Sequence, residues 1–221
     1  MVPGNLILNN ANATQNTQNG SIASTSNVTI NGGGVLTLVG ANTIASLTFN
    51  NVGGTATPSV TGGTVVINGN ITAVNDSYGT TPTIASVLEL NGTNKTITTS
   101  GLSPDDLSIT GVIQNVMGGA TPAGLIKAGT GSLILTAQNT FQGGVQLNAG
   151  TLIIGASSTA STVGAGIASG PLGTGPLTIA ANTTIQPDTT ARTISNPITV
   201  NGNFSIGGVS TALTLNGTVN L

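Results

Sequence analysis

The chain has 221 residues with a formal net charge of −2, only 4% of its residues are charged, and it has neither cysteine nor histidine. Its three cations, Lys95, Lys127 and Arg192, make no basic patch that could neutralise phosphates, which argues against nucleic-acid binding. Without His or Cys, tetrahedral zinc sites and His-dependent nucleophilic triads are excluded. No apolar run approaches the roughly 18 residues of a spanning helix, so we expect no membrane insertion.

Strand signals run along the whole chain, whereas helix signals are almost missing. Gly, Thr, Asn, Ser and Val dominate, and apolar residues rarely recur at helical spacing. Both ends also read as strands, at Asn5 to Leu8 and Thr214 to Leu221. Brief β-branched and aliphatic runs predict further strands at 28–30, 35–39, 47–49, 64–67, 87–90, 132–135, 145–147, 151–154, 177–179, 198–200 and 212–215.

The turns between these strands favour a solenoid over a sandwich. Asn-Gly pairs begin at residues 31, 68, 91, 201 and 216, and both residue types tolerate the positive φ of a tight turn. In a sandwich these pairs would form hairpins, but in a solenoid they form corners. The strands are short, and aromatic residues are only 2% of the chain, as the narrow core of a β-helix requires. The uniform composition favours one domain over residues 1–221.

A thirty-residue segment, Leu125 to Ile154, resembles the autotransporter-associated β-strand repeat of bacterial passenger domains. Further weaker copies are expected near 34–50 and 170–179. The family pattern is a Lys-x-Gly-x-Gly turn, a Leu-x-Leu strand, an Asn-Thr-aromatic turn, a Gly-Gly or Gly-Thr strand start and an Asn-x-Gly-x-Leu strand. The matching elements are Lys127-Ala-Gly-Thr-Gly131, Ser132-Leu-Ile-Leu-Thr136, Gln138-Asn-Thr-Phe141, Gly143-Gly144-Val145 and Asn148-Ala-Gly-Thr-Leu152.

This resemblance implies a right-handed parallel β-helix that is secreted or displayed on a bacterial surface, commonly for adhesion or as a stalk. The family has no shared catalytic residues. The last residues still read as strand, turn and strand in place of the C-terminal barrel of a complete autotransporter, and the first residues are not a secretory signal. We therefore expect a passenger piece or a stand-alone relative.

The adjacent carboxylates Asp105 and Asp106 are the least implausible catalytic acids. They follow Ser103-Pro104, a common turn signal, and adjacent side chains diverge, so we interpret the pair as structural. Asp76, Glu89 and Asp188 are isolated, and no calcium-binding repeat is present. We expect no catalytic, metal or cofactor-binding residues.

Lys127 is expected to pack its stem along a turn. Its neighbours Gly129 and Gly131 resemble a phosphate loop only superficially, because no helix follows and the spacing is wrong.

The leading hypothesis is a non-enzymatic, extracellular structural or adhesive β-solenoid. Its expected partners are other copies of itself, through end-to-end stacking of rungs into a filament, and a cell surface or glycan. The alternative is a carbohydrate-active β-helix enzyme, such as a polysaccharide lyase or hydrolase. A glycan-binding or ice-binding surface made of Thr rows is a third class, although Thr96-Ile97-Thr98 is not repeated on a fixed period.

Overall fold

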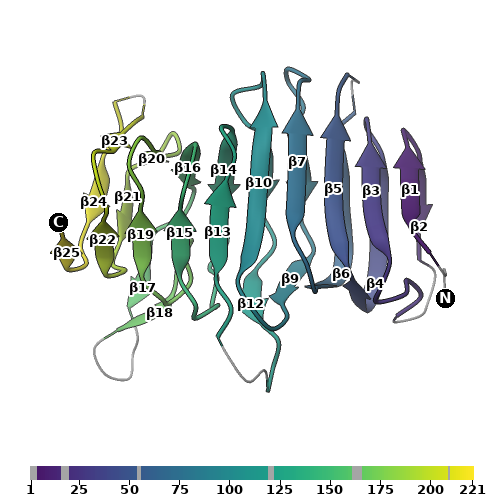
Figure 1. Ribbon diagram of the computed structural model, residues 1–221, viewed down its shortest axis with the longest axis horizontal. Helices are drawn as coiled ribbons and strands as arrows, with labels where there is room; N and C mark the ends of the chain where they lie inside the picture. Colours follow the sequence, from purple (N-terminus) through teal and green to yellow (C-terminus); the bar gives the residue numbers. More distant parts are fainter. Residues whose placement is uncertain (1–3, 16–19, 54–55, 119–121, 161–165, 209) are drawn as a thin grey trace.

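The computed structural model describes residues 4–15, 20–53, 56–118, 122–160, 166–208 and 210–221. In these ranges the chain contains strands and no helix, and its parallel sheets form a β-solenoid of about 9 turns. Successive rungs lie side by side along the long axis, with the two termini at opposite ends (Figure 1). The predicted all-β parallel solenoid is therefore confirmed.

The first face of the solenoid is one parallel sheet that takes a single strand from each rung. Neighbouring strands pair in the order of the chain, so that every rung adds one strand to the sheet. Its strands are β1 (Leu6–Asn9), β3 (Asn27–Asn31), β5 (Ser46–Asn51), β7 (Ile71–Asn75), β10 (Lys95–Gly101), β13 (Leu125–Ala128), β15 (Val145–Leu147), β19 (Leu177–Ile179), β22 (Ile198–Val200) and β25 (Val219–Asn220).

The second sheet is bent, and its bend gives each rung a third side. β4 (Val35–Ile44) and β6 (Ser59–Ile67) pair along their whole length, but their register shifts between Leu38 and Ala41. The first half of β6 pairs in parallel with β8 (Thr83–Ile84), and the second half pairs in parallel with β9 (Val87–Leu90). The remaining strands of this sheet are β2 (Asn12–Thr14), β11 (Leu107–Ile109), β12 (Ile113–Asn115), β14 (Ser132–Leu135), β16 (Thr151–Ile154), β20 (Thr184–Pro187) and β23 (Ser205–Ile206).

Two further pairs complete the described strands. β21 (Arg192–Ile194) pairs in parallel with β24 (Leu213–Leu215). β17 (Thr159–Ala160) and β18 (Ile167–Ser169) form an antiparallel pair, inserted between β16 and β19.

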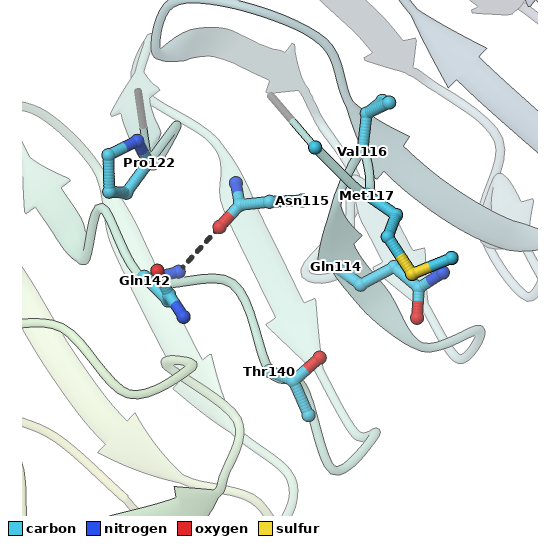
Figure 2. Close-up of a pocket in the computed structure, with 8 residues that line it drawn as sticks. Gln114, Asn115, Val116, Met117, Pro122, Thr140 and Gln142 are labelled. Atoms are coloured by element: carbon cyan, nitrogen blue, oxygen red, sulfur yellow. Dashed lines mark hydrogen bonds between the residues drawn. The ribbon is translucent and has the colours of Figure 1, made fainter. Parts of the chain in front are cut away.

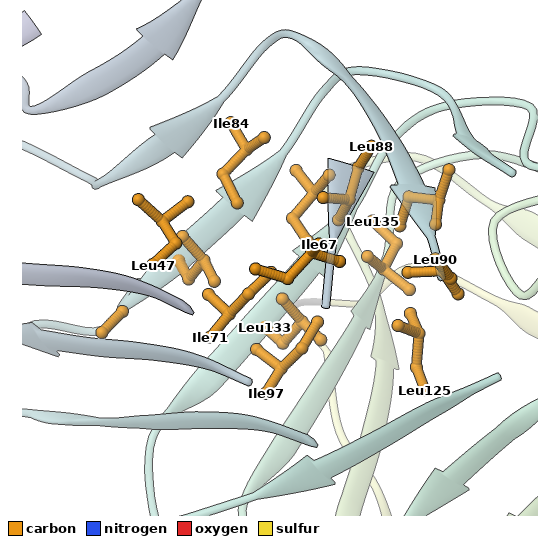
Figure 3. Packing of buried hydrophobic residues seen from close by; sticks show 14 of the residues in the cluster. Leu47, Ile67, Ile71, Ile84, Leu88, Leu90, Ile97, Leu125, Leu133 and Leu135 are labelled. Carbon is orange, nitrogen blue, oxygen red and sulfur yellow. The ribbon is translucent and has the colours of Figure 1, made fainter. Parts of the chain in front are cut away.

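Stacked aliphatic side chains fill the space between the faces. Strand residues alternate between core and surface because the side-chain period of a strand is two. In-register parallel pairing then stacks the aliphatic side chains of neighbouring strands on one another. One fully buried column of this kind contains Val28, Leu47, Ile71 and Ile97. Figure 3 shows side chains of both sheets meeting in this core, among them Ile97 and Leu133. Burying each such side chain stabilises the fold by about 1.5–3 kcal/mol.

The Asn-Gly pairs lie at the predicted corners. Asn31, for example, ends β3 where the first face meets the second, and Gly32 after it has a φ of 57°. Asn91-Gly92 follows β9 in the same way, with a φ of 77° at the glycine. Because the strands on either side of these pairs belong to different faces, the pairs turn the chain around the solenoid instead of making hairpins.

Candidate functional site

The residues that carry the repeat pattern lie in two successive rungs, β13–β14 and β15–β16, and Lys127 is their most unusual side chain. It is fully buried, and its Nζ donates hydrogen bonds to the carbonyl oxygens of Ala128, Gly129 and Ala149 at 2.9, 3.0 and 3.1 Å. Burial lowers the pKa of Lys127 to about 8, although the charge of Asp106 opposes this change. The ammonium group therefore joins the corner of its own rung to the corner of the next.

Glycine is required where these two corners approach each other. Gly150 has a φ of 71°, and a Cβ there would lie 2.3 Å from the carbonyl oxygen of Gly131 and 2.5 Å from that of Gly129. Any other residue would collide with the backbone of the preceding rung. The Asn-x-Gly part of the repeat thus allows the rungs to stack closely.

Asn139 connects three rungs on the third side. Its Oδ1 accepts the N–H of Ile113 at 2.8 Å, and its Nδ2 donates to the carbonyl oxygen of Pro171 at 2.7 Å. The side chain is fully buried, as is that of Phe141 two residues later. The Asn-Thr-aromatic turn therefore supplies one polar link and one core side chain.

The structure separates the two adjacent acids, Asp105 and Asp106, which lie in the turn between β10 and β11 as predicted. Asp106 is buried; its Oδ2 accepts the N–H of Ser132 at 2.7 Å, and its own N–H donates to Ser132 Oγ at 2.9 Å. Burial raises the pKa of Asp106, while the hydrogen bonds from Ser132 oppose the rise. Asp105 is only half-buried and lines a surface groove. The pair does not face one shared site.

Other charged residues are also held by nearby groups. Glu89 Oε1 accepts Gln114 Nε2 at 2.8 Å, and Asp188 forms a bidentate pair with Arg192, at 2.9 and 2.6 Å, which lowers the pKa of Asp188. Lys95 Nζ donates to the carbonyl oxygen of Asn68 at 2.6 Å, and burial lowers the pKa of Lys95. Among the described residues, no cluster of three potential metal-ligating side chains occurs.

The described residues line surface hollows with room for a small molecule, of which two exceed about 300 Å³. Figure 2 shows the larger, of about 440 Å³, in which Asn115 Oδ1 accepts the N–H of Gln142 at 2.9 Å. Its described lining carries no ionisable group and comprises Gln114, Asn115, Val116, Met117, Gly118, Pro122, Thr140 and Gln142.

The second hollow, of about 330 Å³, is a groove over the outer side of β14, β16 and β20, with Ile134 and Ile153 in its lining. Two carboxylates line this groove as well: Asp105, which lies between β10 and β11, and Asp188, which directly follows β20.

The first face carries a column of threonines that the sequence pattern did not predict. Register places Thr29, Thr48, Thr72 and Thr98 side by side on β3, β5, β7 and β10, all half-buried and pointing outward. Their intervals in the sequence are unequal, so a fixed period could not reveal them.

The fold and these contacts define a parallel β-solenoid whose repeat residues join one rung to the next. Residues 125–154 match the family described as passenger-associated-transport-repeat. The predicted resemblance is thus confirmed over the same residues, and together with the solenoid it fits an autotransporter passenger repeat protein. No curated protein and no solved structure matches the chain. Within the described ranges, no helix has the length and apolarity to cross a membrane.

Proposed function

We propose that this protein is a non-enzymatic, single-domain, passenger-like module that acts outside a bacterial cell as a structural and adhesive element. The observation that carries the proposal is the pair of rungs at 125–154. Lys127 and Asn139 join neighbouring rungs through hydrogen bonds to Ala149 and to Ile113 and Pro171, and Gly150 leaves room for the close approach of the two rungs. Such rungs build an extended scaffold, and loops on a rigid scaffold are common places for binding functions.

Surface location is tested on intact cells of the source bacterium. Antibodies raised against the purified chain should label unpermeabilised cells or the growth medium, and protease added outside should remove the label. A cytoplasmic protein measured in the same samples controls for lysis. If the label appears only after the cells are opened, an extracellular role is wrong.

End-to-end stacking of copies is part of the proposal. Among the described strands, β1 pairs only with β3 and β25 only with β22, so each outermost strand leaves one edge unpaired. Parallel rungs repeat one hydrogen-bonding pattern, so an edge of this kind can accept a strand from another copy. Val219 is exposed on β25, the last strand of the first sheet.

The assembly is tested by light scattering over a wide range of protein concentration and by negative-stain microscopy. We expect mass to increase with concentration and short filaments to appear. Val219→Lys should reduce assembly, because it places a charge at the end, whereas Met117→Lys, on an exposed loop at the side, should not. Monomers at every concentration would contradict end-to-end stacking.

A further inference from the structure

Three loops at one corner of the solenoid each expose one large apolar side chain. They follow β5, β7 and β10, whose ends are in register through Asn51, Asn75 and Gly101. Figure 1 shows the upper ends of these three strands as neighbours. Val52 is 58% exposed, Tyr78 is 75% exposed and Leu102 is 75% exposed. We call these three side chains the corner patch.

Buried asparagines hold the loop that carries Tyr78 in place. Asn51 Nδ2 donates to Asn75 Oδ1 at 2.7 Å and to Thr80 Oγ1 at 3.0 Å. Asn75 Nδ2 donates to the carbonyl oxygens of Thr80 and Asp105 at 2.9 and 2.6 Å. Because these contacts fix the loop before any ligand arrives, binding there would cost little ordering entropy.

One carboxylate lies beside the corner patch. The exposed Asp76 follows Asn75 directly, and its Oδ1 accepts the N–H of Leu102 at 3.0 Å, which joins two of the loops. Its Oδ2 has no partner among the described residues. The cations Lys95 and Lys127 are buried, so neither is displayed beside this carboxylate. The corner thus offers apolar surface and a hydrogen-bond acceptor, and it lacks the positive charge that an acidic polymer requires.

We propose that the corner patch binds an uncharged glycan, with a sugar ring lying on Tyr78 and its hydroxyl groups donating to Asp76. The apolar C–H face of a pyranose matches an aromatic ring, and Val52 and Leu102 extend that surface on both sides. An exposed apolar patch rimmed by polar groups is a frequent mark of an interaction site. This inference rests on the proposed adhesive function and assigns its contact surface.

Tyr78 also reports on the site, because the chain has one tyrosine and no tryptophan. Neutral oligosaccharides of glucose, galactose, mannose and N-acetylglucosamine are titrated into the intact chain while tyrosine emission is recorded. We expect a saturable change with at least one of them. Leu102→Ala and Asp76→Asn should weaken that binding about tenfold, the effect of losing one good contact. Met117→Ala, which removes an exposed apolar side chain elsewhere, should bind normally.

Tyr78→Ala removes the fluorophore, so its binding is measured by calorimetry, with circular dichroism to confirm folding. We expect a loss of at least tenfold. The inference is overturned by the absence of a saturable change across the sugar panel, by normal binding in Tyr78→Ala, or by binding confined to lipid vesicles or basic peptides. A chain that labels intact cells yet binds no neutral sugar contradicts this inference alone and leaves the surface location standing.

Discussion

Lys127 lies opposite Ile97 across the β10–β13 pair, so a lysine occupies one position in a column of buried aliphatic side chains. The next member of that column is Leu147 on β15. The stem of the lysine fills the same space as its neighbours, while its Nζ reaches three corner carbonyls. A single residue therefore serves both the core and the corner.

Lys127→Met separates these two roles. Methionine keeps most of the stem volume but leaves the carbonyl oxygens of Ala128, Gly129 and Ala149 without their donor. We expect the free energy of unfolding to fall by about 1–3 kcal/mol, because three partly buried acceptors lose their charged donor. Urea denaturation followed by circular dichroism measures the change. Gln146→Met, at an outward half-buried position on β15, is the matched control and should change stability by less than about 0.5 kcal/mol.

Stability should rise with pH above the neutral range. The pKa of Lys127 is about 8 in the folded chain and 10.5 for an ordinary lysine, so between these values the unfolded chain binds more protons. The free energy of unfolding then increases as pH rises from about 8 to 10.5. Lys95, whose pKa is also lowered, contributes in the same direction. Denaturation curves at several pH values should show a smaller rise in Lys127→Met, and identical profiles would contradict the assignment.

Gly150→Ala tests the close approach of neighbouring rungs. Both Gly150 and Gly79 have positive φ, at 71° and 82°, but a Cβ at Gly79 meets no atom within 4 Å. We expect Gly79→Ala to cost about 1–2 kcal/mol, the usual strain of this backbone conformation. Gly150→Ala adds a collision with the Gly131 carbonyl and should cost clearly more. Equal losses in thermal or urea denaturation would mean that the rungs have room to separate.

Asn139→Ala tests the polar link on the third side. The change leaves the Ile113 N–H and the Pro171 carbonyl unpaired in the interior, and each such group costs about 1–3 kcal/mol. Gln142→Ala, an exposed neighbour, should be nearly neutral. Hydrogen exchange of the Ile113 amide gives a local readout: we expect faster exchange in Asn139→Ala alone. Unchanged exchange would show that water or another group replaces the asparagine.

Short runs of β-branched and aliphatic residues predicted part of the strands with their bounds. β9, β14, β15, β16, β19 and β22 have the predicted bounds. β7, β10, β11, β13 and β20 were among the strands that were not predicted. Two of these, β10 and β13, each contain a buried lysine, and only the structure shows that carbonyl groups satisfy these cations. β4 and β6 were predicted in part, because a strand that turns a corner serves two faces with different registers.

The candidate sites were harder to predict than the strands, because they bring together residues that are far apart in the sequence. The resemblance located the repeat, and the turn signal correctly indicated a turn at Asp105 and Asp106. The corner patch and the threonine column arise only when rungs of unequal length stack in register. Tyr78 stood out in the sequence merely as a scarce aromatic, because its neighbours in space are far away in the chain.

The antiparallel pair β17–β18 has a consequence for how such a scaffold diversifies. It lies between β16 and β19, yet Leu152 still pairs with Ile185 and Leu147 with Ile179. An extra hairpin has thus been accommodated at one corner without shifting the strands on either main face. The corners of this solenoid are natural acceptors for inserted peptides, and new epitopes or binding loops could be placed there with the stacked core left unchanged.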